Sequence, residues 1–123
     1  MAKRILIVED EPEFLDMLSV ILSKAGYEVE GVDNGRDVLP VVKEIKPDLI
    51  ILDVMLPGMD GHAIVAALSK ESDVENIPVI MLTALVQSEP MFKNYNNVKD
   101  FCSKLIDTPE LIEKIQKLIG PAQ

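Results

Sequence analysis

The chain has 123 residues, of which 21 are acidic and 12 basic, and its formal net charge is -9. This length suits one domain with a single core, so residues 1–123 are expected to fold without a metal or disulfide holding them together. The acidic balance and the absence of Lys or Arg runs disfavour direct binding to nucleic acid or to an anionic membrane. Proteins and cations are the expected partners.

Apolar runs and helical patterns alternate along the amino-terminal half. Continuous apolar runs are typical of strands covered on both faces, and apolar residues at helical spacing indicate amphipathic helices. The expected elements are a strand over 4–8, a helix from Pro12 that stops at Gly26, an edge strand over 27–32, a helix over 36–45 and a strand over 49–52 that ends at Asp53.

The same alternation continues to the carboxyl end. The expected elements are a helix running to about Lys70, a strand over 79–82, one or two helical turns within 85–97, a strand over 98–103 and a helix from Thr108 that stops at Gly120. Pro90 and several Asn residues weaken the helix within 85–97. The sequence therefore predicts an α/β fold: one three-layer sandwich with a five-stranded parallel sheet and five helices, the fourth short or irregular.

Several polar residues follow the predicted strands, at the edge where ligands bind in parallel sheets. They are Glu9, Asp10, Asp53, Thr83 and Lys104. Three acids at one edge would repel one another, so a divalent cation or a lysine must neutralise them. Oxygen ligands and few protein groups favour Mg²⁺ over Ca²⁺, with Asp10 and Asp53 as ligands and Glu9 acting through water. With a metal alongside, a carboxylate can attack a phosphoryl group and hold it as an acyl phosphate, which Thr83 would hydrogen-bond.

Some residues have simpler interpretations. Asp53 alone could cap a helix or lie in a solvated loop. Cys102 is expected to be a small core residue, and His62 is expected at the surface with no metal. The apolar stretch in the opening MAKRILIVED is too short for a signal peptide or a membrane span, so we expect a cytoplasmic protein.

Over essentially its whole length the chain resembles the response-regulator receiver domains of two-component signalling. The resemblance rests on Glu9-Asp10, on Asp53 within LDVMLPGMDG, on Thr83-Ala84 and on Lys104, in family order. It implies a flavodoxin-like fold with strand order 2-1-3-4-5. It also implies a phosphorelay role, in which Asp53 takes a phosphoryl group from the phosphohistidine of a sensor histidine kinase or phosphotransfer protein. Mg²⁺ would be held by Asp10, Asp53, the backbone carbonyl of Met55 and, through water, Glu9, while Lys104 and Thr83 contact the phosphate.

Four positions qualify the resemblance. In this family the positions of Met55 and Leu85 tune phosphate loss, and both residues are apolar here. Leu105 follows Lys104 where the family usually has proline, often with a cis bond, so this bond is either cis or trans with a shifted lysine. Phe101 takes the place of an aromatic that changes rotamer in many receivers, or is simply core.

Competing functions remain open at this point. The first is a phospho-acceptor switch that catalyses only its own phosphorylation and hydrolysis, is otherwise no enzyme, and acts on an unknown downstream protein. The alternative is a receiver-like interaction module that is never phosphorylated. A hydrolase of the haloacid dehalogenase type would need a second Asp where Met55 stands, and a flavin phosphate would be repelled by the acids after Val8. Since the chain ends at Gln123, it is either a stand-alone receiver or part of a longer regulator.

Overall fold

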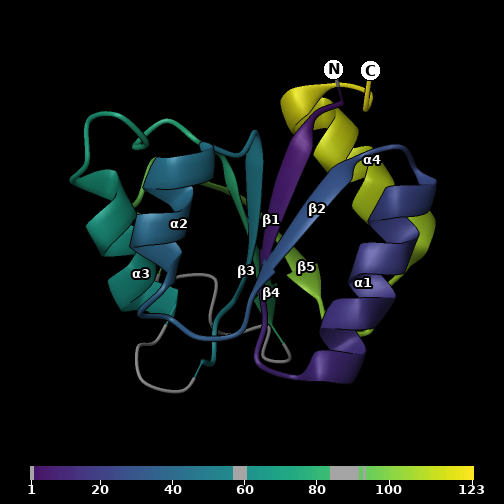
Figure 1. Cartoon of the computed structure of the whole chain (residues 1–123), viewed down its shortest axis with the longest axis horizontal. Coiled ribbons are helices and arrows are strands. Elements are labelled where there is room, and N and C mark those ends of the chain that lie inside the picture. Colours follow the sequence, from purple (N-terminus) through teal and green to yellow (C-terminus); the bar gives the residue numbers. More distant parts are fainter. Residues whose placement is uncertain (1, 57–60, 84–91, 93) are drawn as a thin grey trace.

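A five-stranded parallel sheet lies between two layers of helices in the computed structural model, which describes residues 2–56, 61–83, 92 and 94–123 (Figure 1). The strand order is β2-β1-β3-β4-β5, which confirms the order implied by the resemblance. The strands are β1 (Arg4–Val8), β2 (Glu28–Val32), β3 (Leu49–Asp53), β4 (Val79–Thr83) and β5 (Val98–Ser103). Parallel pairing places all five carboxyl ends at one edge of the sheet.

The described ranges contain four helices, not the five expected. They are α1 (Pro12–Lys24), α2 (Val38–Ile45), α3 (Gly61–Ser69) and α4 (Thr108–Ile119). Residues 84–91 and 93, with Leu85 and Pro90 among them, lie outside the described part, and most of the predicted fourth helix falls there. No helix in the described ranges has the length and apolar character needed to cross a membrane.

The central strands bury both of their faces, as their continuous apolar runs predict. Alternate side chains of β1, β3 and β4 point to opposite faces of the sheet, so each strand contributes side chains to two hydrophobic cores. One core lies toward α2 and α3 and the other toward α1 and α4 (Figure 1). β2 is an edge strand whose Glu28 and Glu30 are exposed, as expected. This buried framework fixes the positions at which the strands end.

The start of α2 differs from the prediction. The helix begins at Val38 and not near Arg36, because the preceding turn uses its own side chains for hydrogen bonding. Asn34 Oδ1 accepts from the Asp37 N–H at 3.0 Å, and Asn34 Nδ2 donates to Asp37 at 2.9 Å. Such side-chain bonds compete with helix formation. Pro40 then falls in the first turn, where its missing N–H costs no helical hydrogen bond.

His62 is not the simple surface residue that the sequence predicted. It opens α3 half-buried, its Nε2 lies 3.2 Å from the hydroxyl of Tyr95, and its ring packs against Phe92 at a centroid distance of 5.9 Å. Phe92 in turn packs against Phe101, which is half-buried against the core. Cys102 is buried, as expected.

Candidate functional site

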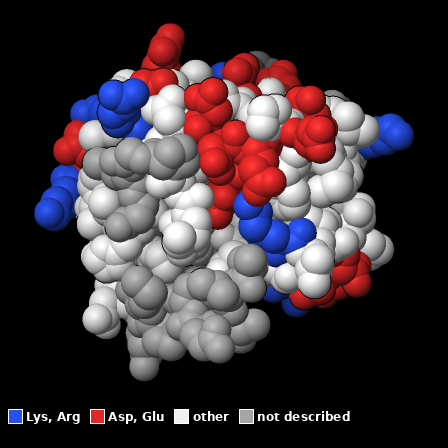
Figure 2. Space-filling model, turned by 90° about the horizontal axis from the view of Figure 1, so that it is seen from below, with Lys and Arg blue, Asp and Glu red and all other residues white. Residues whose placement is uncertain are grey.

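The predicted site residues meet at the carboxyl edge of the sheet. Asp53 ends β3 and Thr83 ends β4. Glu9 and Asp10 follow β1, and Lys104 follows β5. They surround a pocket of about 280 Å³, lined by Asp10, Glu11, Asp53, Val54, Met55, Thr83 and Lys104. Figure 2, which views this edge from below, shows acidic side chains gathered in a dense patch with basic atoms beside it.

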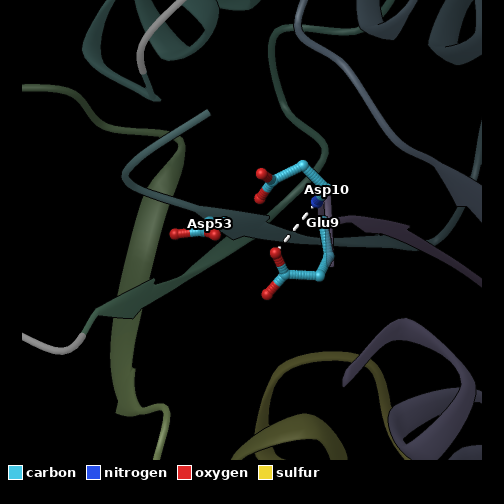
Figure 3. Close-up of side chains that lie close together, drawn as sticks. All are labelled: Glu9, Asp10 and Asp53. Carbon is cyan, nitrogen blue, oxygen red and sulfur yellow. Dashed lines mark hydrogen bonds between the residues drawn. The ribbon is translucent and has the colours of Figure 1, made fainter. Parts of the chain in front are cut away.

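Three carboxylates converge in this pocket. Glu9, Asp10 and Asp53 each offer an oxygen, and these atoms all lie within 4.8 Å of one another (Figure 3). Glu9 is fully buried and Asp53 is only 3% exposed, whereas Asp10 is the most accessible of the three. The Asp10 N–H donates to Glu9 Oε2 at 2.9 Å, the dashed line in Figure 3. Such a cluster is unstable without a positive charge nearby.

That positive charge is the ammonium of Lys104, which reaches in from the end of β5. Its Nζ lies 2.8 Å from Glu9 Oε1, 3.0 Å from Asp53 Oδ2 and 3.2 Å from Glu11 Oε1. The lysine side chain is 19% exposed. Burial alone would lower the pKa of Lys104, but its bonds to Glu9 and Asp53 raise that pKa above the ordinary value. The lysine is therefore positively charged across the physiological range.

Glu9 carries a perturbed carboxyl group. Burial raises its pKa from 4.5 to about 7; Lys104 opposes this rise and Asp53 adds to it. Its Oε1 has the Lys104 ion pair but no hydrogen bond of good geometry, so it is a buried acceptor with remaining capacity. Glu9 is therefore partly protonated near neutral pH, a property that the sequence alone did not indicate.

The backbone holds Asp53 in one orientation. Its Oδ1 accepts from the Met55 N–H at 3.0 Å, while Oδ2 faces Lys104. The Val54 N–H donates to the Leu82 carbonyl, so the chain leaving β3 is fixed against β4. The Lys104 N–H donates to the Thr83 carbonyl at 3.2 Å, which joins β5 to β4 at the same edge. Both ends of the Asp53 carboxylate thus have a defined partner.

The donor set fits a small hard cation such as Mg²⁺. Carboxylate oxygens are the ligands that this ion prefers, and three of them converge here with an acceptor of Glu9 still available. Met55 lines the same pocket and is 70% exposed, so it lies at the mouth of the pocket. The residues present can therefore hold the ion that the sequence predicted.

Two neighbours of Lys104 were not assigned a role from the sequence. They are Glu11, which directly precedes α1, and Phe14, which lies in the first turn of that helix. In the structure Lys104 Nζ lies 5.0 Å from the centre of the Phe14 ring. The spacing of Glu11 and Phe14 from Glu9 gives no local signal for these contacts, because Lys104 lies 93 positions after Glu11 in the chain.

A family model for the response regulator receiver domain matches residues 5–116. The chain belongs to this family. Its curated relatives include protein PilH of Pseudomonas aeruginosa, which is 30% identical over 95% of this receiver domain and 98% of PilH. Another is the DNA-binding dual master transcriptional regulator RpaA of Synechocystis, 34% identical over 94% of the receiver domain. The receiver domain spans about half the length of RpaA and of several other curated relatives, 48% in the case of RpaA.

Solved receiver structures share the fold. The response regulator TrrA of Thermotoga maritima, solved in complex with Mg²⁺-BeF, has a TM-score of 0.84 and 31% identity, and covers 94% of this chain and 98% of its own. The peptide bond after Lys104 departs from the family pattern. The described peptide bonds include none in cis, so Lys104–Leu105 is trans, and the lysine still reaches Asp53.

Proposed function

We propose that this receiver domain is a phospho-acceptor switch. Asp53 takes a phosphoryl group from the phosphohistidine of a sensor histidine kinase or phosphotransfer protein, and the altered surface binds a downstream protein. The observation that carries the proposal is the convergence of Lys104, Glu9 and Asp10 on a nearly buried Asp53. A structural ion pair would need neither three carboxylates nor a pocket open to a donor.

The geometry around Asp53 suits attack on phosphorus. Lys104 occupies one oxygen and the Met55 N–H the other, which orients the carboxylate. Lys104 can then neutralise charge on the transferring oxygens, and Thr83, which lines the same pocket, can contact them. Mg²⁺ held by Glu9, Asp10, Asp53 and the Met55 carbonyl would add further charge neutralisation when bound. Burial of Asp53 limits the access of water to the acyl phosphate.

The phosphodonor protein is proposed to dock around the mouth of the pocket. Met55 and Leu105 follow two site residues and are 70% and 90% exposed. Exposed apolar side chains flanking a polar site are typical of a surface that a protein covers. RpaA is named as DNA-binding, but its relationship to this chain covers 48% of its length, so direct nucleic-acid binding remains a predicted absence here.

We expect no turnover of an external substrate beyond self-catalysed phosphorylation and hydrolysis. A second carboxylate two residues after Asp53 would assist a hydrolase, and the largely exposed Met55 stands there instead.

A receiver domain that is never phosphorylated would act only as an interaction module. That alternative has no need for a half-buried lysine paired with Glu9, Glu11 and Asp53 together, so the geometry favours the switch.

Treatment with Mg²⁺ and acetyl phosphate, followed by intact-mass measurement, tests the proposal. The wild type should gain one phosphoryl adduct, and Asp53→Asn should gain none. Asp48→Asn is the matched control, because Asp48 lies just before the opposite end of β3 and binds the Arg4 N–H at 2.8 Å. Absence of an adduct on the wild type, together with no detectable Mg²⁺ binding, would support the interaction module.

A further inference from the structure

The ammonium of Lys104 makes two kinds of contact. The first is with Asp53 and Glu9, which the proposed function assigns to the phosphoryl group and to Mg²⁺. The second is with Glu11 and the face of Phe14, to which that function gives no part in the chemistry. A lysine has a flexible four-carbon stem, so something must keep its charge at the site when the first two partners change.

We infer that Glu11 and Phe14 form a bracket that positions Lys104 for the phosphoryl group, an inference that rests on the proposed function. Once Asp53 is an acyl phosphate, its carboxylate no longer pairs with the ammonium, which must move from Asp53 to the phosphoryl oxygens. The bracket then retains it, since neither Glu11 nor Phe14 changes its chemistry in the reaction. Both are positioning residues that act through Lys104.

Phe14 should be the stronger half of the bracket. An aromatic ring attracts a cation through the negative potential of its face, and this attraction grows when the cation is shielded from water. Lys104 is 19% exposed, whereas Glu11 is 67% exposed and its ion pair is weakened by solvent. Phe14 is half-buried and packs against the core beneath α1 and α4.

The backbone does not fix the ammonium by itself. The Lys104 N–H donates to the Thr83 carbonyl, and the Leu105 N–H donates to Ser103 Oγ at 3.0 Å. These bonds fix the main chain at Lys104 but not its side chain. From there the side chain reaches Glu11, which directly precedes α1, and Phe14 in the first turn of that helix. The first turn of α1 thus contributes to a site otherwise built from strand ends.

The test compares Phe14→Leu, Phe14→Trp and Glu11→Gln with the wild type. Initial rates of phosphorylation by acetyl phosphate are measured over a range of Mg²⁺ concentrations. We expect Phe14→Leu to lower the maximal rate about three- to tenfold, the range typical of a cation–π contact, with the half-saturating Mg²⁺ concentration unchanged. Phe14→Trp should restore the rate, and Glu11→Gln should lower it less than Phe14→Leu does.

Two controls separate positioning from general loss of stability. Tyr27→Leu removes another aromatic from the same core, one that precedes β2 at the amino-terminal edge of the sheet, and Glu13→Gln removes an acid from the first turn of α1. Neither should change the rate while the protein stays folded.

A second readout is labelling with acetic anhydride in the absence of Mg²⁺ and phosphodonor. Mass spectrometry compares the labelling of Lys104 with that of the exposed Lys117. We expect labelling of Lys104 to rise several-fold in Phe14→Leu.

The outcomes distinguish this inference from the proposed function. If the wild type is phosphorylated and Phe14→Leu matches it in rate or in Lys104 labelling, the bracket is wrong while the switch stands. If Phe14→Trp fails to rescue a slow Phe14→Leu, the ring face is not the cause, and the inference is also overturned. If the wild type takes no phosphoryl group, the proposed function fails and the positioning role fails with it, whatever the labelling shows.

Discussion

Lys104 and Asp53 are 51 positions apart in the chain, yet the ammonium of the first lies 3.0 Å from the carboxylate of the second. The same ammonium also lies 2.8 Å from the fully buried Glu9. Without a bound metal, this one lysine is the main positive charge facing the two buried carboxylates. The site is therefore held together by the groups that the proposed reaction must rearrange.

Removing that lysine should destabilise the metal-free protein. Lys104→Met leaves Glu9 and Asp53 without compensation, and we expect it to lower the free energy of unfolding by roughly 2 kcal/mol at neutral pH, a value discounted for partial exposure. Urea denaturation measures this. Added Mg²⁺ should reduce the difference in unfolding free energy between Lys104→Met and the wild type, because the cation replaces the lost positive charge. Lys117→Met removes a 73% exposed lysine paired with Glu113 and should have little effect; equal losses in both variants would contradict the prediction.

The buried carboxyl of Glu9 should make stability depend on pH. Burial raises its pKa from 4.5 to about 7, so the folded state holds this proton more tightly than the unfolded state does. The contribution of this carboxyl to the free energy of unfolding is fully present below pH 4.5 and is lost as the pH rises through about 7. Relative to the wild type, Glu9→Gln should gain roughly 3 kcal/mol of unfolding free energy across this interval. Denaturation curves at several pH values would show parallel profiles if the prediction is wrong.

The affinity for Mg²⁺ should fall below neutral pH for the same reason. A proton on Glu9 reduces the negative charge available to the ion, and metal ligands must be deprotonated to bind. Calorimetric titration between about pH 6 and pH 8 should show tighter Mg²⁺ binding as the pH rises. In the lower half of this pH range, the dissociation constant should change by up to about tenfold per pH unit. Glu9→Gln should bind more weakly and with a flatter profile. A steep profile in that variant would place the titrating group elsewhere.

The strands and the convergence of the acids could be predicted from the sequence, because both depend on local signals. Apolar runs locate buried strands, and parallel strands bring their carboxyl ends to one edge. The burial of Glu9, the ring of Phe14 beside Lys104 and the hydrogen-bond contact of His62 with Tyr95 could not be predicted. Each depends on how segments distant in sequence pack, and neither composition nor spacing reports that packing.

The exposed Met55 should slow loss of the phosphoryl group. Its apolar side chain is at the mouth of the pocket, where it can neither bind nor orient an attacking water. Met55→Glu should therefore speed decay of the acyl phosphate several-fold, and we expect the same direction for Leu85→Lys, whose position lies outside the described residues. Decay is followed by intact mass after removal of the phosphodonor. Met17→Glu, on α1, is the control, and an unchanged decay rate in Met55→Glu would refute the prediction.

Gly61 should be intolerant of a side chain, and the consequence should extend to the site. A Cβ there would lie 3.0 Å from Val54 Cα and 3.1 Å from the Val54 carbonyl oxygen, both backbone atoms next to Asp53. The Gly61 N–H also donates to that carbonyl at 2.9 Å. Since backbone cannot move as a side chain does, Gly61→Ala should cost about 1 to 3 kcal/mol of unfolding free energy and slow phosphorylation of Asp53.

Gly31→Ala provides the matched comparison for Gly61→Ala. Its added Cβ would also come within 3.0 Å of a neighbour, but that neighbour is the end of the Leu15 side chain, which can rotate away. We expect a smaller loss of stability and no change in phosphorylation rate. If the two variants lose equal stability and neither affects the rate, the close packing of Gly61 against Val54 does not position Asp53.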